Sequence, residues 1–382
     1  MTNTVLKVAL YPYLPDSAGD NYESLLQFIT VEFKKIYPNI TLLLRPISFD
    51  DDFYNLVVLT KWLKSDGSGY DVVEVDTELL GDLVNAGLIT PQFSLSHNHS
   101  DWHSAAATAV QFNQAVYGFP HYMCALFLFT RNDKVASVNT IDQLIDALGN
   151  TSTNNYRLVG NLASSWDLPS MWISSYQNSI SSGNDEVAFA LHSYSNNSFE
   201  TMSKLARLCD RIGEINHCLN GTFNGTNYEI PALLFARNQT AAMFDYSERL
   251  FFILKNGSLD DYQNVKMIPL PTGKLRNQPV FFSDAFVFRR NMSEDVLEAA
   301  RSFADFMGTP RMQAAVVGSG DSPGSIPRYL LPMSISAYNE PLLANNRFYQ
   351  TYFRHLTGLP YPTIGLSNTR LQLQAAILNY IN

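Results

Sequence analysis

Cys124 is one of three cysteines in a chain of 382 residues, and a cysteine side chain can act as a nucleophile. It follows a predicted turn at Gly118 and Pro120, and the apolar run from Met123 to Phe129 predicts a buried strand that begins at about Cys124. A thiol at the mouth of such a strand can be a nucleophile that faces a cleft. A position in the core is the alternative, because free cysteine is among the most buried residue types.

The two other cysteines, Cys209 and Cys218, are separated by eight residues. One disulfide can close a loop of this length if the compartment is oxidising. Cys124 is then an odd cysteine, which in a secreted chain indicates a reactive thiol or an intermolecular partner. The cysteine pattern therefore favours the nucleophile over the core position.

A cysteine nucleophile needs a base that makes it a thiolate at neutral pH. His121 lies three residues before Cys124, and strand alternation predicts that it points to the other face. Glu248 follows an apolar strand predicted at residues 240–246. Burial there would raise the pKa of Glu248 into the range of a general base, although an isolated acid is also typical of a helix cap or a surface.

Other tyrosines and acids, after, at the end of or within predicted strands and in one loop, are the candidate substrate-binding residues: Tyr11, Tyr13, Asp76, Tyr228, Tyr246 and Asp284. Aromatic ring faces next to carboxylates form a cradle for an organic cation. The net charge of −9 argues against nucleic acid and anionic membranes as partners and is compatible with a cationic ligand.

The elements that must position these residues alternate between strand and helix. Strands are predicted at residues 4–10, 41–47, 70–76, 124–129, 157–162, 240–246, 265–271 and 281–288. Helices are predicted at residues 22–36, 53–64, 77–86, 140–148, 167–176, 199–215, 250–255, 293–307 and 369–380. The first β-α-β unit implies a parallel sheet, and ligands of open α/β sheets bind at the carboxyl ends of the strands.

This order predicts an α/β protein of two lobes with a ligand cleft between them. We expect the first lobe to contain residues 1–120 and 283–330. The second lobe is expected to contain residues 121–282 and 331–382. Cys124 and Asp284 both fall near the predicted crossings between the lobes.

Several other classes of site are not supported by the sequence. His97, His99 and His103 are close enough to bind a metal, but their polar surroundings have no helix or strand register, so we expect a solvated loop and no metal. No run of 18 apolar residues predicts a transmembrane helix, and no signal peptide precedes the strand-like sequence at Val5.

Nine Asn-x-Ser/Thr sequons nevertheless favour a secreted, glycosylated protein, with a cytoplasmic location as the alternative. The sequons begin at Asn39, Asn98, Asn150, Asn196, Asn220, Asn224, Asn238, Asn256 and Asn291.

Five segments in the first three quarters of the chain resemble thiaminase I (thiamine pyridinylase), a family built like type II periplasmic solute-binding proteins. They are, in order, Leu6–Asp16, the strand that ends at Asp76, Tyr117–Cys124, Tyr246-Ser-Glu248 and Phe282-Ser-Asp284. The Tyr-Gly-x-Pro…Cys and Tyr-Ser-Glu pieces are the most specific, since the others also fit a generic solute-binding protein.

The resemblance implies a complete set of roles. Cys124 would be the nucleophile that attacks the pyrimidine of thiamine, and Glu248 the base that activates it. Asp76 and Asp284 would bind the pyrimidine or balance the thiazolium charge, and the four tyrosines would line the cleft. The expected partners are thiamine and a small amine, pyridine or thiol, with no metal or organic cofactor, and the chain is expected to be a monomer.

Two departures from the family pattern concern the site. Phe282 stands where the family usually has tyrosine, and residues 105–114 lack the acid that the family has before its Tyr-Gly-x-Pro motif. Asp101 is the candidate substitute for that acid. Two other functions remain open: a thiamine- or solute-binding protein without catalysis, and a cysteine transferase or hydrolase that acts on another heteroaromatic compound.

Overall fold

The computed structural model describes the chain in nine ranges: residues 3–49, 52–92, 99–149, 156–180, 195–209, 215–258, 260–274, 277–363 and 366–381. The chain forms two compact units. Unit 1 contains residues 1–124, 281–353 and 360–367, and unit 2 contains residues 125–280, 354–359 and 368–382.

The sheet of unit 1 brings together the ends of several predicted strands. Its strand order is β12-β6-β11-β3-β1-β2, with β13 also paired to β11. The strands are β1 (Thr4–Ala9), β2 (Ile40–Leu44), β3 (Val72–Asp76), β6 (Gly118–Cys124), β11 (Val280–Phe288), β12 (Leu331–Pro332) and β13 (Leu359–Pro360). Because β11 is antiparallel to both β3 and β6, and β1 is parallel to β3, the carboxyl ends of β1, β3 and β6 meet at one edge.

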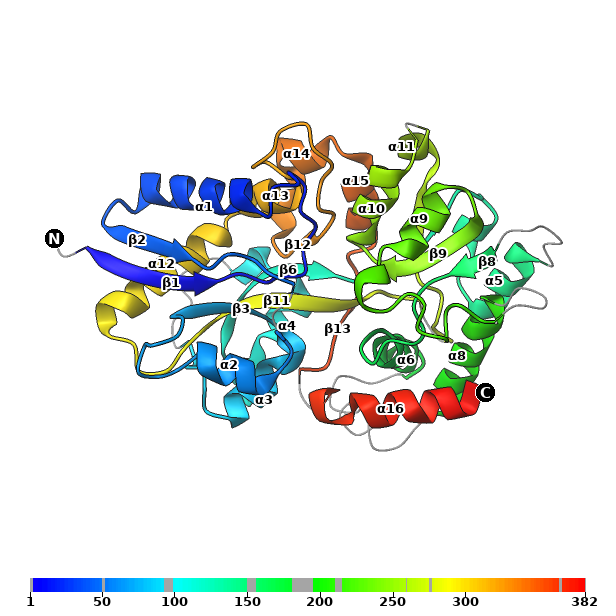
Figure 1. Cartoon of the computed structure of the whole chain (residues 1–382), viewed down its shortest axis with the longest axis horizontal. Coiled ribbons are helices and arrows are strands. Elements are labelled where there is room, and N and C mark those ends of the chain that lie inside the picture. The colour runs from blue at the N-terminus through cyan, green and yellow to red at the C-terminus, as the bar shows by residue number, and fades with distance from the viewer. Residues whose placement is uncertain are drawn as a thin grey trace. The chain divides into compact units, whose positions relative to one another are not determined.

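Helices cover the sheet of unit 1. They are α1 (Glu23–Ile36), α2 (Leu56–Trp62), α3 (Leu80–Asn85), α4 (Ser104–Ala109), α12 (Glu294–Met307), α13 (Pro310–Val317), α14 (Pro341–Ala344) and α15 (Arg347–Arg354). In Figure 1, α1 lies above β1 and β2, while α2 and α3 lie below. The apolar stripe of α1 buries Phe33 against Phe303 and Phe306 of α12, with ring centroids 5.7 and 5.4 Å apart.

The prediction that Gly118 and Pro120 form a turn before a strand at 124–129 is wrong. Residues 118–124 are already strand β6, and a new strand, β7 (Leu126–Thr130), begins after Ala125 in unit 2. The pairing of β6 with β11 shifts between Asp284 and Ala285, so β6 has a bulge at His121. A proline is tolerated there because a bulge interrupts the hydrogen-bonded ladder.

Unit 2 has a four-stranded sheet in the order β10-β7-β9-β8, which adds β8 (Tyr156–Val159), β9 (Thr240–Tyr246) and β10 (Lys266–Pro269). Its helices are α5 (Ile141–Leu148), α6 (Asp167–Gln177), α8 (Asn196–Leu208), α9 (Ile230–Ala236), α10 (Arg249–Asn256), α11 (Asp261–Asn264) and α16 (Leu366–Ile381). The helix expected at 199–215 ends at Leu208. Directly after it, a disulfide joins Cys209 to Cys218 across a Cα–Cα distance of 6.1 Å.

The expected division into lobes differs from the structure at its first and last boundaries. Residues 121–124, which include Cys124, are expected in the second lobe but belong to unit 1. Residues 331–382 are also expected in the second lobe, but residues 331–353 and 360–367 belong to unit 1. The reason is strand pairing, since β12 is hydrogen-bonded to β6 through Leu331 opposite Met123 and Pro332 opposite Tyr122.

Two further observations concern the predicted absences. Over the described ranges, no helix is both long enough and apolar enough to cross a membrane. Of the three clustered histidines, His97 lies outside the described residues. His103 is buried rather than solvated, and its Nδ1 accepts a hydrogen bond of 3.2 Å from the N–H of Ala105 at the start of α4.

Candidate functional site

The strand register of unit 1 brings the predicted nucleophile and two predicted acids to one face of the sheet. Asp284 of β11 lies opposite Asp76 of β3 on one side and Tyr122 of β6 on the other, and Phe282 lies opposite Cys124. Residues directly opposite each other in an antiparallel pair share a face, as do residues two apart in one strand. Asp76, Asp284 and Cys124 are therefore neighbours on this face.

Cys124 is the last residue of β6 and is half-buried. The other two cysteines are joined to each other and are each 2% exposed. A position in the protein core, the alternative to a nucleophile, therefore fits Cys209 and Cys218 better than it fits Cys124. The end of a strand at an acidic sheet edge is a position from which a thiol can meet a ligand.

Tyr11 and Tyr13 lie in the loop after β1, and a residue that the sequence did not suggest connects them to Asp76. The hydroxyl of Tyr54 lies 2.9 Å from that of Tyr11 and donates to Oδ2 of Asp76 at 3.1 Å. The ring of Tyr13 stacks on the ring of Tyr54, with centroids 5.7 Å apart. The sequence did not indicate a role for Tyr54 because this residue falls in the helix predicted at 53–64. The helix in fact begins at Leu56, so Tyr54 lies outside it.

The electrostatics of this face favour a cationic ligand. Burial raises the pKa of Asp76 to about 6, although hydrogen bonds from the Glu78 N–H and the Tyr54 hydroxyl act in the opposite direction. Burial also raises the pKa of Tyr11 well above its usual value, and the charges of Asp284, Asp76 and Cys124 raise it further. These charges are therefore concentrated around an aromatic ring, as in a cation cradle.

His121 has a structural partner. Its Nδ1 lies 2.5 Å from Oε1 of Glu74, and both side chains are buried. The other carboxylate oxygen of Glu74 accepts the N–H of Tyr11 at 3.0 Å. The Glu74–His121 pair therefore fixes the backbone at Tyr11, the start of the loop that carries Tyr11 and Tyr13 (residues 10–16, the tyrosine loop).

The structure shows the contacts of Phe282 and Asp101, the two residues that concern the departures from the family pattern. Phe282 packs against Tyr361, with ring centroids 4.2 Å apart, so a tyrosine lies close to the position where a hydroxyl is lost. The carboxylate of Asp101, the candidate substitute acid, binds the hydroxyl of Ser334 and both the N–H and hydroxyl of Ser336. Asp101 therefore caps the segment at 334–336.

In unit 2, Glu248 lies between the end of β9 and the start of α10. It is 7% exposed, and its Oε2 accepts a hydrogen bond of 3.3 Å from the hydroxyl of Ser247. Burial raises the pKa of Glu248 to about 7, the charge of Arg249 lowers it, and that of Asp245 raises it. A glutamic acid with this pKa can accept a proton near neutral pH.

In unit 2, the side chain of Arg249 contacts both Tyr228 and Asp245. Its guanidinium lies 4.6 Å from the ring centroid of Tyr228, and its Nε lies 3.3 Å from Oδ1 of Asp245. One ring face of Tyr228 is thus occupied by a protein cation, which the sequence prediction did not include. Tyr246 is the last residue of β9, two positions before Glu248.

The two units thus hold separate groups of the predicted residues. Unit 1 brings together Tyr11, Tyr13, Asp76, Asp284 and Cys124, and unit 2 brings together Tyr228, Tyr246 and Glu248. Among the described residues, no group of three His, Cys, Asp or Glu side chains is arranged to hold a metal ion.

Comparison with known proteins identifies the architecture. A model of the bacterial extracellular solute-binding proteins matches residues 30–338. A relative named Thiaminase-1 from Paenibacillus thiaminolyticus is 25% identical over 358 residues, which cover 88% of this chain and 78% of the relative.

Two solved structures are similar over almost their whole length. Thiaminase I from Bacillus thiaminolyticus has a TM-score of 0.76 at 20% identity, with 99% of this chain and 100% of that chain covered. Clostridium botulinum thiaminase I in complex with thiamin has a TM-score of 0.75 at 18% identity, with 98% and 99% covered. The chain therefore belongs to the bacterial extracellular solute-binding protein family and has a thiaminase I-like form of its fold.

Proposed function

We propose that this protein cleaves thiamine by transferring its pyrimidine group to an external amine, pyridine or thiol. The observation that carries the proposal is the combination of a half-buried thiol beside two acids in unit 1 and a buried glutamic acid with a pKa of about 7 in unit 2. The first is a nucleophile and the second is a general base suited to neutral pH.

The proposed reaction has two steps. Glu248 accepts the proton of the Cys124 thiol, and the thiolate adds to the electron-poor pyrimidine carbon next to the methylene bridge. The bond between the methylene carbon and the thiazolium nitrogen breaks, and its electron pair leaves with the thiazole, which becomes neutral. The external nucleophile then adds to the methylene carbon, the thiolate is expelled, and Glu248 handles the nucleophile's proton.

Within unit 2, the carbonyl of Ala125, the residue that follows Cys124 in the chain, accepts a hydrogen bond of 3.0 Å from the N–H of Ser247, the residue before Glu248. The acids Asp76 and Asp284 and the rings of the tyrosine loop would hold the thiazolium cation before it leaves.

Solute binding without catalysis is the competing function. Membership of the solute-binding family favours it as much as it favours cleavage. A pure binder, however, gains nothing from a glutamic acid whose burial raises its pKa to about 7 or from a reactive thiol. The thiamin bound to the Clostridium botulinum structure indicates thiamine as the solute under either function.

We also propose that the protein works in an oxidising, extracellular setting. The disulfide between Cys209 and Cys218 requires such conditions to persist. All sequon asparagines with a described side chain are exposed, as glycosylation requires: Asn39, Asn196, Asn220, Asn224, Asn238, Asn256 and Asn291.

The direct test is thiamine turnover with pyridine as acceptor, followed by mass spectrometry. The wild-type protein should release the thiazole and form a pyrimidine–pyridine product, and Cys124→Ser should lose at least about 10³-fold in kcat. Full activity in Cys124→Ser would disprove the covalent mechanism. Unchanged thiamine in the presence of wild-type protein that binds it would establish solute binding instead.

A further inference from the structure

The loop that carries Tyr11 and Tyr13 depends on side chains from elsewhere in unit 1 for its shape. Pro12 and Pro15 lack an N–H, so two of its residues cannot donate a backbone hydrogen bond. At its start, the N–H of Tyr11 donates to Glu74 at 3.0 Å. At its end, a carbonyl is held by a buried arginine.

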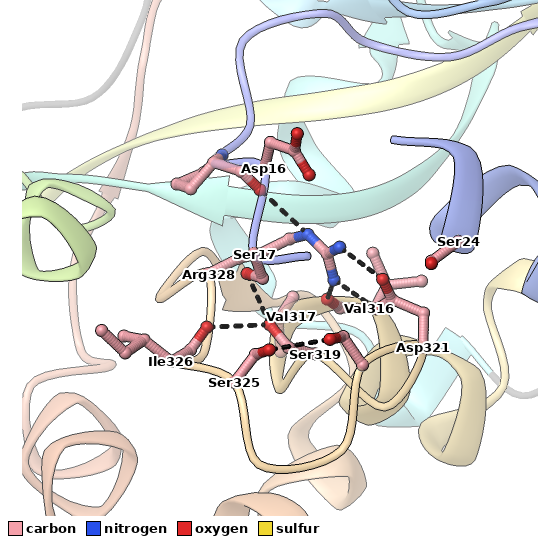
Figure 2. A network of polar contacts seen from close by, with 12 residues as sticks. Asp16, Ser17, Ser24, Val316, Val317, Ser319, Asp321, Ser325, Ile326 and Arg328 are labelled. Carbon is pink, nitrogen blue, oxygen red and sulfur yellow. Dashed lines mark hydrogen bonds and ion pairs between the residues drawn. The ribbon is translucent and has the colours of Figure 1, made fainter. Parts of the chain in front are cut away.

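That arginine is Arg328, whose side chain is completely buried. Its Nε donates to the Pro15 carbonyl at 3.1 Å and its Nη1 to the Val316 carbonyl at 2.7 Å. Nη1 and Nη2 donate to the two carboxylate oxygens of Asp321 at 2.6 and 2.8 Å (Figure 2). This two-pronged pairing neutralises the buried charge and fixes the plane of the guanidinium, which a lysine cannot reproduce.

The segment that supplies the arginine is itself held in an uncommon conformation. Ser319 and Tyr329 each have a φ of 60°, a region that residues other than glycine seldom adopt. Oγ of Ser319 lies 2.7 Å from Oγ of Ser17 and 3.1 Å from the Ile326 carbonyl (Figure 2). Such conformations persist only where surrounding contacts enforce them, and they are concentrated at functional sites.

The same segment continues into the strand next to the nucleophile. Three residues after Arg328, β12 begins, and its Leu331 and Pro332 pair with Met123 and Tyr122 of β6. The arginine therefore connects the loop of Tyr11 and Tyr13 to the strand that ends at Cys124.

We propose that Arg328 is a positioning residue that fixes the tyrosine loop (residues 10–16) relative to the strand of Cys124 and thereby sets the affinity for thiamine. The part of this inference that concerns thiamine rests on the proposed function. The part that concerns the loop does not, so the two can fail separately.

Unit 1 offers a matched control at the other end of β3. The guanidinium of Arg289 is paired with Asp71, with Nε 2.9 Å from Oδ1, and Asp71 also accepts the N–H of Lys7 at 2.9 Å. Both side chains are buried, so this ion pair resembles the Arg328–Asp321 pair in kind. Asp71 precedes β3, whereas the site residue Asp76 ends it.

The experiment compares Arg328→Lys with Arg289→Lys in the full chain. Hydrogen exchange of peptides that cover residues 10–22 and steady-state kinetics with thiamine and pyridine are measured for both. In Arg328→Lys, we expect exchange in the loop to accelerate about tenfold or more and KM to rise about tenfold, with kcat changed by less than about threefold. Arg289→Lys should leave loop exchange and KM at wild-type values.

Wild-type loop exchange in Arg328→Lys, or equal acceleration in both variants, would overturn the proposal. If Arg328→Lys does not fold, Asp321→Asn serves as the second variant, because it keeps the carbonyl contacts of the arginine and removes its paired charge; the loop should again exchange faster. If the wild-type protein does not turn over thiamine, the proposed function fails, and loop exchange alone decides the positioning role.

Discussion

Glu248 has an environment unlike that of an ordinary surface acid. Its burial at the start of α10 raises the pKa to about 7, and the neighbouring Arg249 offsets only part of that effect. A protein that needed Glu248 only as a helix cap would leave it exposed, since a buried carboxylate is costly. This environment supports the proposed role of Glu248 as a proton acceptor.

The first prediction concerns Glu248→Gln, which removes this acceptor. Because the base acts when it has lost its proton, kcat/KM of the wild-type protein should rise with pH and level off above about 7. The variant should lose about 10²–10⁴-fold in kcat/KM and lack this rise. Glu200→Gln, at an exposed acid of α8, is the control and should match the wild type.

Stability provides an independent check on the same variant. Between pH 4.5 and about 7 the folded protein keeps the proton of Glu248 that the unfolded chain releases, so wild-type stability falls as pH rises through this window. Glutamine does not ionise, so the stability of the variant lacks this fall with pH. The variant should therefore be more stable than the wild type at pH 8 by up to about 3 kcal/mol. A stability difference that does not change with pH would contradict the raised pKa.

The second prediction concerns Tyr54→Phe. Loss of the hydroxyl removes a donor to Asp76 and a neighbour of the Tyr11 hydroxyl, which should weaken thiamine binding by roughly 1–2 kcal/mol. Because that hydroxyl lowers the pKa of Asp76, binding should also be lost at a higher pH on acidification than in the wild type, where it declines through about 6. Titration calorimetry across pH measures both effects.

Tyr70→Phe is the control for Tyr54→Phe. Tyr70 packs against Trp62 in the same unit, with ring centroids 5.6 Å apart. Equal weakening in both variants would show a general effect of removing a tyrosine hydroxyl from unit 1.

At the scale of residues, sequence patterns indicated the thiol and the acids better than their partners. Cys124 and Asp76 end their strands, and Glu248 follows the end of β9 by two residues; strand ends can be recognised from apolar runs. Tyr54 and Arg249 act through contacts with residues of other elements, and no local spacing reveals such contacts.

At the scale of elements, alternation between strands and helices was predictable, whereas pairing was not. The strands at 4–9, 72–76 and 240–246 match their predicted positions closely. The break at Ala125 was missed because the apolar run from Met123 to Phe129 includes both the end of β6 and the start of β7. Only the pairing with β11, including the bulge at His121, shows that β6 ends at Cys124.

The third prediction concerns the disulfide that follows α8. Replacing Cys209 and Cys218 by serine should lower the free energy of unfolding by about 2–3 kcal/mol, because the unfolded chain regains the freedom of a short loop. Guanidinium unfolding measures the change. Thiamine turnover should stay close to that of the wild type, since Cys124 is not part of this bond; loss of turnover without loss of stability would contradict a structural role.

At the scale of the whole molecule, the family fold was predictable because its motifs are spread along the chain in order. The division into units was harder to predict, since the chain passes between them several times. The assignment of residues 331–353 failed because a two-residue strand decides it, and two residues carry no periodic signal.

The fourth prediction concerns ligand binding by the whole chain. Thiamine at about 100 times its Kd should stabilise Cys124→Ser by about 2.7 kcal/mol and raise Tm by about 3–8 °C. A neutral disaccharide is the control and should leave Tm unchanged. An equal shift with the disaccharide would indicate a general solute-binding site.

The most direct test of the central claim is the intact mass of the protein after incubation with thiamine alone. Without an added amine, pyridine or thiol, only water can act as acceptor in the second step. The account therefore predicts that the pyrimidine accumulates on the protein, that peptide mapping places it on Cys124, and that pyridine then removes it. An unchanged mass while thiamine is bound, or an adduct on another residue, would contradict Cys124 as the nucleophile.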